Sequence, residues 1–113
     1  MTRMDDAVRL MIYLGEEKRH GDRPLYHAIV ARARALKLAG ATVLHGTEGF
    51  GQSTRLHTAE VLFSEDLPVV IVIIDTADKI DPFVAELTET RDIALVTREK
   101  ITGYRAANAA TLP

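Results

Sequence analysis

The most restrictive feature of the sequence is an uninterrupted run of six aliphatic residues, Val69 to Ile74. Pro68 opens this run and Asp75 closes it, and strands tolerate proline at their first residue. Because successive side chains of a strand point to opposite faces, the run is apolar on both faces. It therefore predicts a central strand that is covered on both sides, and it is much shorter than the ~20 apolar residues of a membrane-spanning helix.

Two segments have the pattern of helices. Residues 22–40 carry an apolar stripe opposite charged positions, with Asp22 as the expected cap and Gly40 at the far end. In residues 75–89, Asp81-Pro82 is typical of an N-cap followed by the first helical residue, so the second helix is expected to begin there. Each helix then has one apolar side to bury against a sheet.

The remaining strands are expected at residues 7–14, which alternate with a period of two, at 41–44 and at 93–101. The resulting order is strand, helix, strand, strand, helix, strand. This βαββαβ order is that of the ferredoxin-like α+β fold, an antiparallel four-stranded sheet with both helices on one face. We therefore predict this fold, with a long connection between the second and third strands.

A ferredoxin-like sheet has one face without helices, and here that face is predicted to be apolar. Three of the aliphatic residues in 69–74 point away from the helices, and Met11 and Tyr13 join them. Exposing this surface would create a larger apolar patch than monomers usually tolerate. Because burial gains ~25 cal/mol per Å², we expect copies of the chain to associate through this face as a closed symmetric ring. The alternative is that the tail folds back over it.

Composition narrows the class of protein. The 113 residues suit a single domain, 1–113, with its core at about 7–102 and a frayed or weakly docked tail at 103–113. A net charge of −2 does not favour nucleic-acid binding. The absence of cysteine excludes disulfides and thiolate sites and fits a reducing cytosol. Since the acidic N-terminus has no apolar signal stretch, we expect a soluble cytoplasmic protein.

The connection between the second and third strands, residues 45–66, far exceeds the ~2–5 residues of a hairpin loop. Connections of that length are usually functional or disordered. Gly49-Phe50-Gly51 would permit positive φ and close approach to a ligand, and its amides would suit an anion. Residues 58–63 are expected to re-form a strand that pairs with residues before Gly49. His45 and His57 flank the glycines and are candidates for hydrogen bonding or for a metal.

The same connection resembles the PII signalling proteins, which have Gly-Phe-Gly after the second strand, a His-Thr pair in the loop and Leu-Pro at the third strand. Here these are Gly49-Phe50-Gly51, His57-Thr58 and Leu67-Pro68. The stretches "IYLGEEKRHGDRPLYHAIV", "GATVL" and "SEDLPVVI" are still more similar to a bacterial and archaeal family of PII-like proteins, domain of unknown function 190. The similarity extends from about Val8 to Val96. It implies a homotrimer whose sheets form an inner barrel, with a flexible T-loop (45–66).

The resemblance also implies a function and a site. PII relatives bind small effectors, typically adenine nucleotides, in clefts between subunits, and the ordered T-loop then docks on a transporter, an enzyme or a regulator. The candidate ligand-binding residues lie on the loop and on the last strand, whose cations would hold phosphate or carboxylate. They are Gly49, Phe50, Gly51, Gln52, Ser53, Arg55, His57, Arg98 and Lys100.

The chain departs from the PII pattern at three places. Thr90-Arg91-Asp92 stands where PII proteins have a loop of glycine and lysine that holds phosphate. Leu62 and Phe63 stand near the position of the uridylylated tyrosine. Gln52 lies one residue before the glutamine that helps to hold 2-oxoglutarate and magnesium, and Ser53 takes its place. The resemblance thus implies the subunit arrangement and loop of the PII proteins with a different effector.

The main functional hypothesis is a non-catalytic trimeric regulator, without a cofactor, that senses an adenine nucleotide or another small anionic metabolite. Two alternatives stay open: a metal-binding or metal-tolerance trimer that uses His45 and His57, and a constitutive adaptor for a protein or membrane transporter. No nucleophile-base pair or paired-carboxylate motif is present, so catalysis is not expected. No dedicated metal site is expected either, because close His and carboxylate spacing is missing.

Overall fold

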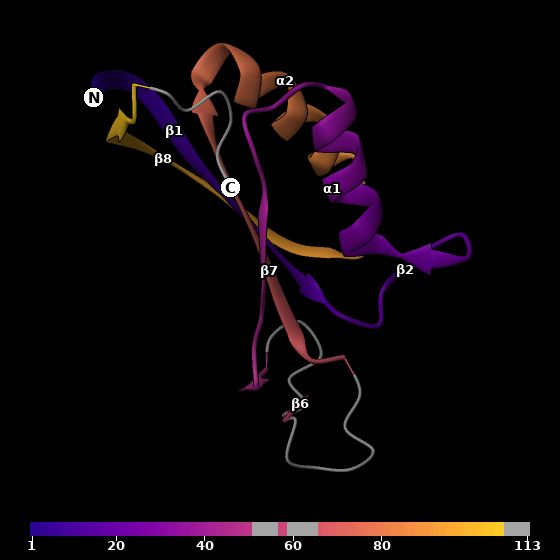
Figure 1. The fold of residues 1–113 in the computed structure, drawn as a ribbon. Coiled ribbons are helices and arrows are strands. Elements are labelled where there is room, and N and C mark those ends of the chain that lie inside the picture. The colour runs from indigo at the N-terminus through magenta and orange to yellow at the C-terminus, as the bar shows by residue number, and fades with distance from the viewer. Residues whose placement is uncertain (51–56, 59–65, 108–113) are drawn as a thin grey trace.

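The computed structural model describes residues 1–50, 57–58 and 66–107 (Figure 1). A four-stranded antiparallel sheet in the order β4-β7-β1-β8 is its main element. The sheet strands are β1 (Thr2–Gly15), β4 (Thr42–His45), β7 (Pro68–Thr76) and β8 (Ile93–Arg105). Both helices, α1 (Leu25–Ala35) and α2 (Ala77–Thr88), lie on one face of this sheet. The predicted ferredoxin-like α+β fold is confirmed.

Two short hairpins lie outside the main sheet. The first is formed by β2 (Arg19–His20) and β3 (Arg23–Pro24), in the segment between β1 and α1. Gly21 makes this hairpin possible because its φ of 64° suits a residue without a side chain. The second is formed by β5 (Glu48–Gly49) and β6 (His57–Thr58), at the base of the long connection.

The core lies between the sheet and the two helices. The register pairs Leu10 with Ile73 and Ile12 with Ile71, and all four side chains are fully buried. Phe83 of α2 and Ile29 of α1 pack against them. Burial of an aliphatic or aromatic side chain stabilises a fold by ~1.5–3 kcal/mol. Packing of the helices on these inward-facing side chains of β1 and β7 therefore holds the helices on the sheet.

Helix α1 is shorter than predicted at both ends. Asp22 does not cap it: Pro24 occupies the N-cap position, and no side chain accepts a hydrogen bond there. At the other end the helix stops before Gly40, because Lys37 adopts the left-handed conformation with a φ of 61°. The Leu38 amide donates to the Ala33 carbonyl and the Lys37 amide to the Arg34 carbonyl, as in a Schellman motif. A lysine therefore occupies a position that usually favours glycine.

Helix α2 begins earlier than predicted. Thr76 is its N-cap and Ala77 its first residue, so the expected start at Asp81-Pro82 is wrong and Pro82 lies inside the helix. The cause is packing, because Ile80, Phe83 and Leu87 are all buried and are spaced as one helical side. Their burial outweighs the loss of one backbone hydrogen bond at Pro82. Neither helix in the described part of the chain is long and apolar enough to cross a bilayer.

The outer ends of β1 and β8 extend beyond the predicted strands. Thr2 pairs with Arg105 and Arg3 with Tyr104, with an irregularity between Met4 and Ala7. The predicted boundary between core and tail at residue 103 is therefore too early, since Gly103 to Arg105 belong to β8. Residues 108–113, which were the alternative cover for the sheet, lie outside the described residues.

Strand β7 ends at a buried carboxylate. Asp75 is only 7% exposed and is the one buried polar residue among those that the structure describes. One of its oxygens accepts a hydrogen bond from the Ala39 amide at 2.9 Å, and the other accepts from the Thr76 amide at 2.8 Å. Because β4 pairs only with the first part of β7, this contact joins the α1–β4 connection to the part of β7 that β4 does not reach.

Candidate functional site

The candidate site lies where the long connection leaves the sheet between β4 and β7 (Figure 1). His45, the last residue of β4, pairs with Val69, and the Gly46 amide donates to the Pro68 carbonyl at 2.7 Å. The pairing then continues in the β5–β6 hairpin, where Glu48 faces Thr58 and Gly49 faces His57. The expected return pairing is confirmed for Thr58, and residues 59–63 lie outside the described part of the chain.

Two glycines of this base permit close packing on Pro68. A Cβ on Gly46 would lie 2.6 Å from the Pro68 Cγ atom, and one on Gly49 would lie 3.0 Å from it. Gly49 does not have positive φ, so its predicted role as a turn residue is wrong. Its role in the structure is close approach, since a Cβ at this place would lie closer to the proline ring than an ordinary van der Waals contact.

The returning end of the connection is tied to the end of β1. Asp66 has a φ of 57°, and its carboxylate accepts a hydrogen bond from the Glu17 amide at 3.0 Å. The same carboxylate lies 3.3 Å from the Lys18 Nζ atom. This contact requires Gly15, because a Cβ there would lie 1.8 Å from the Asp66 Oδ1 atom. Asp66 therefore anchors the base of the connection.

A histidine, a carboxylate and an aromatic ring meet beside this anchor. The His45 Nδ1 atom lies 3.2 Å from the Glu16 Oε1 atom, and the His45 ring stands edge-on to Tyr26 with centroids 5.4 Å apart. The side chains of both ionisable residues are partly exposed, at 46% and 34%. The three residues come from the end of β4, the end of β1 and the start of α1, so the base of the connection has a polar wall.

The side of the sheet without helices is largely apolar and is uncovered in the described part of the chain, although the register also places the Arg9–Glu99 ion pair on it. It has five half-buried side chains, Met11, Tyr13, Val70, Val72 and Ile74. Two leucines on the outer strands are about half exposed, Leu44 at 53% and Leu95 at 54%. The register places Leu44, Val70, Tyr13 and Leu95 in one row across the four strands. We call this surface the helix-free face.

The structure brings together only some of the residues predicted to bind a ligand. Gly49 and His57 are paired in the β5–β6 hairpin, and Phe50 beside them is 74% exposed. Gly51, Gln52, Ser53 and Arg55 lie outside the described residues.

The two cations of the last strand lie elsewhere in the same copy. Arg98 donates from Nε to Asp81 Oδ1 at 2.8 Å, which ties it to α2, and Lys100 is exposed two residues further along β8. Because β8 and β4 are the two outer strands, three spacings of ~4.8 Å, about 14 Å, separate them. Within a single chain, these cations and the base of the connection do not form one site.

Asp66 and Glu16 could not be predicted as parts of this site from the sequence. No periodicity or motif marks either residue, since their contacts join distant parts of the chain, as for Glu17 and Asp66, which are 49 positions apart. The metal hypothesis receives no support from the described residues, in which no group of three or more potential ligands occurs. His45 is instead placed to bond Glu16.

The fold is that of the PII-like proteins. The chain superimposes on a solved structure of CPII, a nitrogen regulatory PII-like protein from Thiomonas intermedia bound to ADP, AMP and bicarbonate, with a TM-score of 0.63. The two share 16% sequence identity over 88% of this chain and 89% of the other. A second structure of CPII, bound to ADP and bicarbonate, gives a TM-score of 0.58 at the same identity and coverage.

The sequence identifies the family within this fold. Residues 7–103 match the model of the DUF190 family, described as "Uncharacterized ACR", and the chain belongs to this family. A UPF0166 protein of Aquifex aeolicus is 30% identical over 93 residues, which are 81% of this chain and 88% of the relative. Another UPF0166 match from the same organism is 35% identical over 65 residues, 57% of this chain and 68% of the relative. The resemblance stated from the sequence is thus confirmed.

Proposed function

We propose that this protein is a PII-like regulator that works as a homotrimer. A small anionic effector, an adenine nucleotide or another anionic metabolite, binds in the clefts between subunits. The effector orders the T-loop (45–66), which then docks on a protein or membrane-transporter target. The proposal includes no catalytic step and no cofactor.

The helix-free face is the observation that carries this proposal. Seven of its side chains are aliphatic or aromatic, its charged residues Arg9 and Glu99 pair with each other, and its two leucines are about half exposed in one copy. Burying such a surface is favourable by ~25 cal/mol per Å² of apolar area. A closed ring of copies buries the helix-free face of every copy, so association in a ring is favoured. Clefts between subunits arise only after this association. The clefts are also needed to combine the base of the T-loop with Arg98 and Lys100, which lie apart within one chain.

The choice of ligand is supported by chemistry and by the relatives. One CPII structure is bound to ADP, AMP and bicarbonate and the other to ADP and bicarbonate, and all three ligands are anions. Arg98 and Lys100 supply cations on β8, and Arg55 supplies another on the T-loop. Thr90-Arg91-Asp92 stands where PII proteins have their phosphate-holding loop. Because that loop is missing, a mononucleotide or small organic anion is a better candidate ligand than a nucleoside triphosphate.

Two measurements test the proposal together. Light scattering is expected to give the mass of three chains at micromolar concentration, and calorimetric titration is expected to show saturable binding of at least one of ADP, AMP, cyclic nucleotides and bicarbonate. Lys100→Gln should weaken binding of that anion, whereas Arg34→Gln, an exposed change on α1, should not. A single-chain mass, or no heat from any anion, would refute the regulator.

Hydrogen exchange separates the regulator from a constitutive adaptor. Addition of the bound anion should protect the amides of 45–66 from exchange if the effector orders the T-loop. Equal exchange with and without the anion would favour an adaptor whose docking needs no signal. The metal alternative is tested by titrating the protein with zinc or copper. Binding that is lost in His57→Ala would favour the metal-binding trimer.

A further inference from the structure

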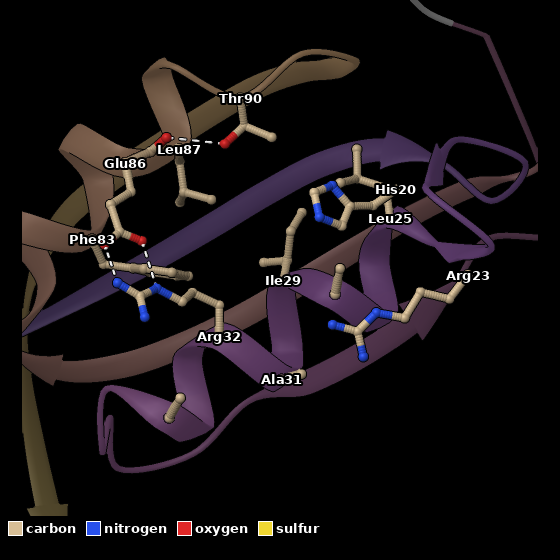
Figure 2. A pocket seen from close by; sticks show the side chains of 12 residues that line it. His20, Arg23, Leu25, Ile29, Ala31, Arg32, Phe83, Glu86, Leu87 and Thr90 are labelled. Carbon is tan, nitrogen blue, oxygen red and sulfur yellow. Dashed lines mark hydrogen bonds and ion pairs between the residues drawn. The ribbon is translucent and has the colours of Figure 1, made fainter.

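A groove of about 420 Å³ lies between α1, α2 and the β2–β3 hairpin (Figure 2). None of the residues predicted to bind the effector lines it. The volume falls within the ~300–1,000 Å³ typical of small-molecule sites. Residues of both helices line the groove, and both helices lie on the side of the sheet opposite the helix-free face, so covering that face leaves the groove open.

The floor of the groove is apolar and fixed in place. Leu25 and Ile29 of α1 and Phe83 and Leu87 of α2 reach its surface, and each is at most 5% exposed because the rest of its side chain packs in the core. Side chains held in this way lose little freedom when a ligand arrives, so the site is preformed.

The space exists because one side of α1 carries alanines. Ala28, Ala31 and Ala35 line the groove at helical spacing, where larger side chains would fill it. Alanine and leucine are both strong helix formers, so leucine at one of these positions would occupy the groove without opposing the helix.

The two ends of the groove differ in charge. Arg32 bridges to Glu86 across it, with Nε to Oε2 at 3.0 Å and Nη2 to Oε1 at 2.7 Å, and the hydrogen bond lowers the pKa of Glu86. This pair is neutral overall.

His20 and Arg23 line the hairpin end, and in the described residues neither forms an ion pair. Arg19 donates to the backbone carbonyl of Asp22 beside them, and the Asp22 carboxylate is exposed at the tip of the hairpin. The hairpin end of the groove therefore presents unpaired donors to a ligand.

We propose that this groove is a second small-molecule site, for an amphipathic anion. The aromatic or aliphatic body of the ligand lies on the apolar floor beside the alanines of α1, and its carboxylate, sulfonate or phosphate faces Arg23 and His20. A bidentate arginine contact suits an anion of this kind. The proposal is independent of the effector site between subunits.

The test uses two fluorescent probes that differ only in charge. Anilinonaphthalene sulfonate has an aromatic body and one sulfonate, and phenylnaphthylamine has the same body without the charge. Each is titrated into the full chain, and its dissociation constant is measured from the fluorescence. The sulfonate should bind more tightly than the neutral probe, and equal affinity of the two would overturn the proposed role of the cations.

Four variants locate the site. Ala31→Leu should weaken both probes by about tenfold or more, because leucine fills the groove. Arg23→Gln should weaken the sulfonate roughly threefold to tenfold and leave the neutral probe unchanged. The matched controls, Ala85→Leu on the exposed side of α2 and Arg34→Gln on α1, do not line the groove and should change neither affinity.

Glu86→Gln gives a change in the opposite direction. It removes the only carboxylate that lines the groove in the described residues and frees the Arg32 guanidinium, so sulfonate binding should tighten roughly threefold. Thermal unfolding of each variant shows that it is folded. If Ala31→Leu and Arg23→Gln bind the sulfonate as the parent does, the probe lies elsewhere and the proposal is refuted, whatever the effect of Ala85→Leu.

Discussion

The contact between Gly15 and Asp66 permits a quantitative test of how the long connection between β4 and β7 is anchored. In Gly15→Ala the new Cβ would lie 1.8 Å from the Asp66 Oδ1 atom and 2.2 Å from its Cγ atom. No pair of atoms tolerates these separations, so the carboxylate must move. It then loses the hydrogen bond from the Glu17 amide at 3.0 Å and the Lys18 Nζ contact at 3.3 Å.

The expected cost follows from these two contacts. A hydrogen bond to a charged group contributes ~1.5–3 kcal/mol, and a partly exposed ion pair contributes ~0–1 kcal/mol. Alanine recovers ~0.5–1 kcal/mol over glycine within a strand. Gly15→Ala should therefore lower the free energy of unfolding by about 2 kcal/mol. In an Asp66→Gly background, where the carboxylate is absent, Gly15→Ala should instead be stabilising by ~0.5–1 kcal/mol.

Urea unfolding of the parent, the two single variants and the double variant forms a double-mutant cycle. All four proteins are measured at one chain concentration, because association adds to apparent stability. The coupling free energy between residues 15 and 66 is expected to be about 2 to 3 kcal/mol. Additivity within ~0.5 kcal/mol would refute the proposed contact, since residues that do not touch add to that precision.

Three further predictions follow from other parts of the molecule. Val72→Lys places a charge within the helix-free face and should reduce the mass measured by light scattering to that of one chain; an unchanged mass would contradict association through this face. Lys37→Gly removes the strain at a φ of 61° and should raise the free energy of unfolding by ~1 kcal/mol in urea, and a loss of stability would be the opposite of what the Schellman geometry requires. Because pairing with Arg32 holds the pKa of Glu86 below its ordinary value, the pair stabilises the fold above the unfolded-state pKa and loses this as pH falls through the folded-state value. Glu86→Gln should then lower Tm at neutral pH, with the difference from the parent disappearing in acid; a difference that persists in acid would show that the ion pair is not its cause.

The fold could be predicted because burial dictates it and burial is visible as periodicity. Alternation at Val8, Leu10 and Ile12 marked the core side of β1, and all three are buried. The aliphatic run of β7 likewise predicted a strand with two apolar faces, which the structure confirms. These patterns depend on neighbouring residues only, so one sequence is enough to read them.

The ends of the elements and the site could not be predicted in the same way. Pro82 is a strong local signal for a helix start, yet the burial of Ile80 carries α2 one turn further back. Lys37 ends α1 in a conformation for which its side chain gives no signal. Asp66 contacts the end of β1 only after the sheet has formed, so its role is a property of the tertiary structure.

The two apolar faces of β7 affect how accurately the chain folds. In most strands a displacement by one position would turn polar side chains into the core, and that penalty selects the correct alignment. Strand β7 lacks this safeguard, because its outward aliphatic side chains nearly match its inward ones in size and shape. The correct alignment must then be selected at its two ends, by Pro68 against the glycines and by Asp75, which accepts the Ala39 amide. Changes at these ends should produce a mixture of misaligned molecules, so folding fidelity depends on two residues outside the hydrophobic cluster.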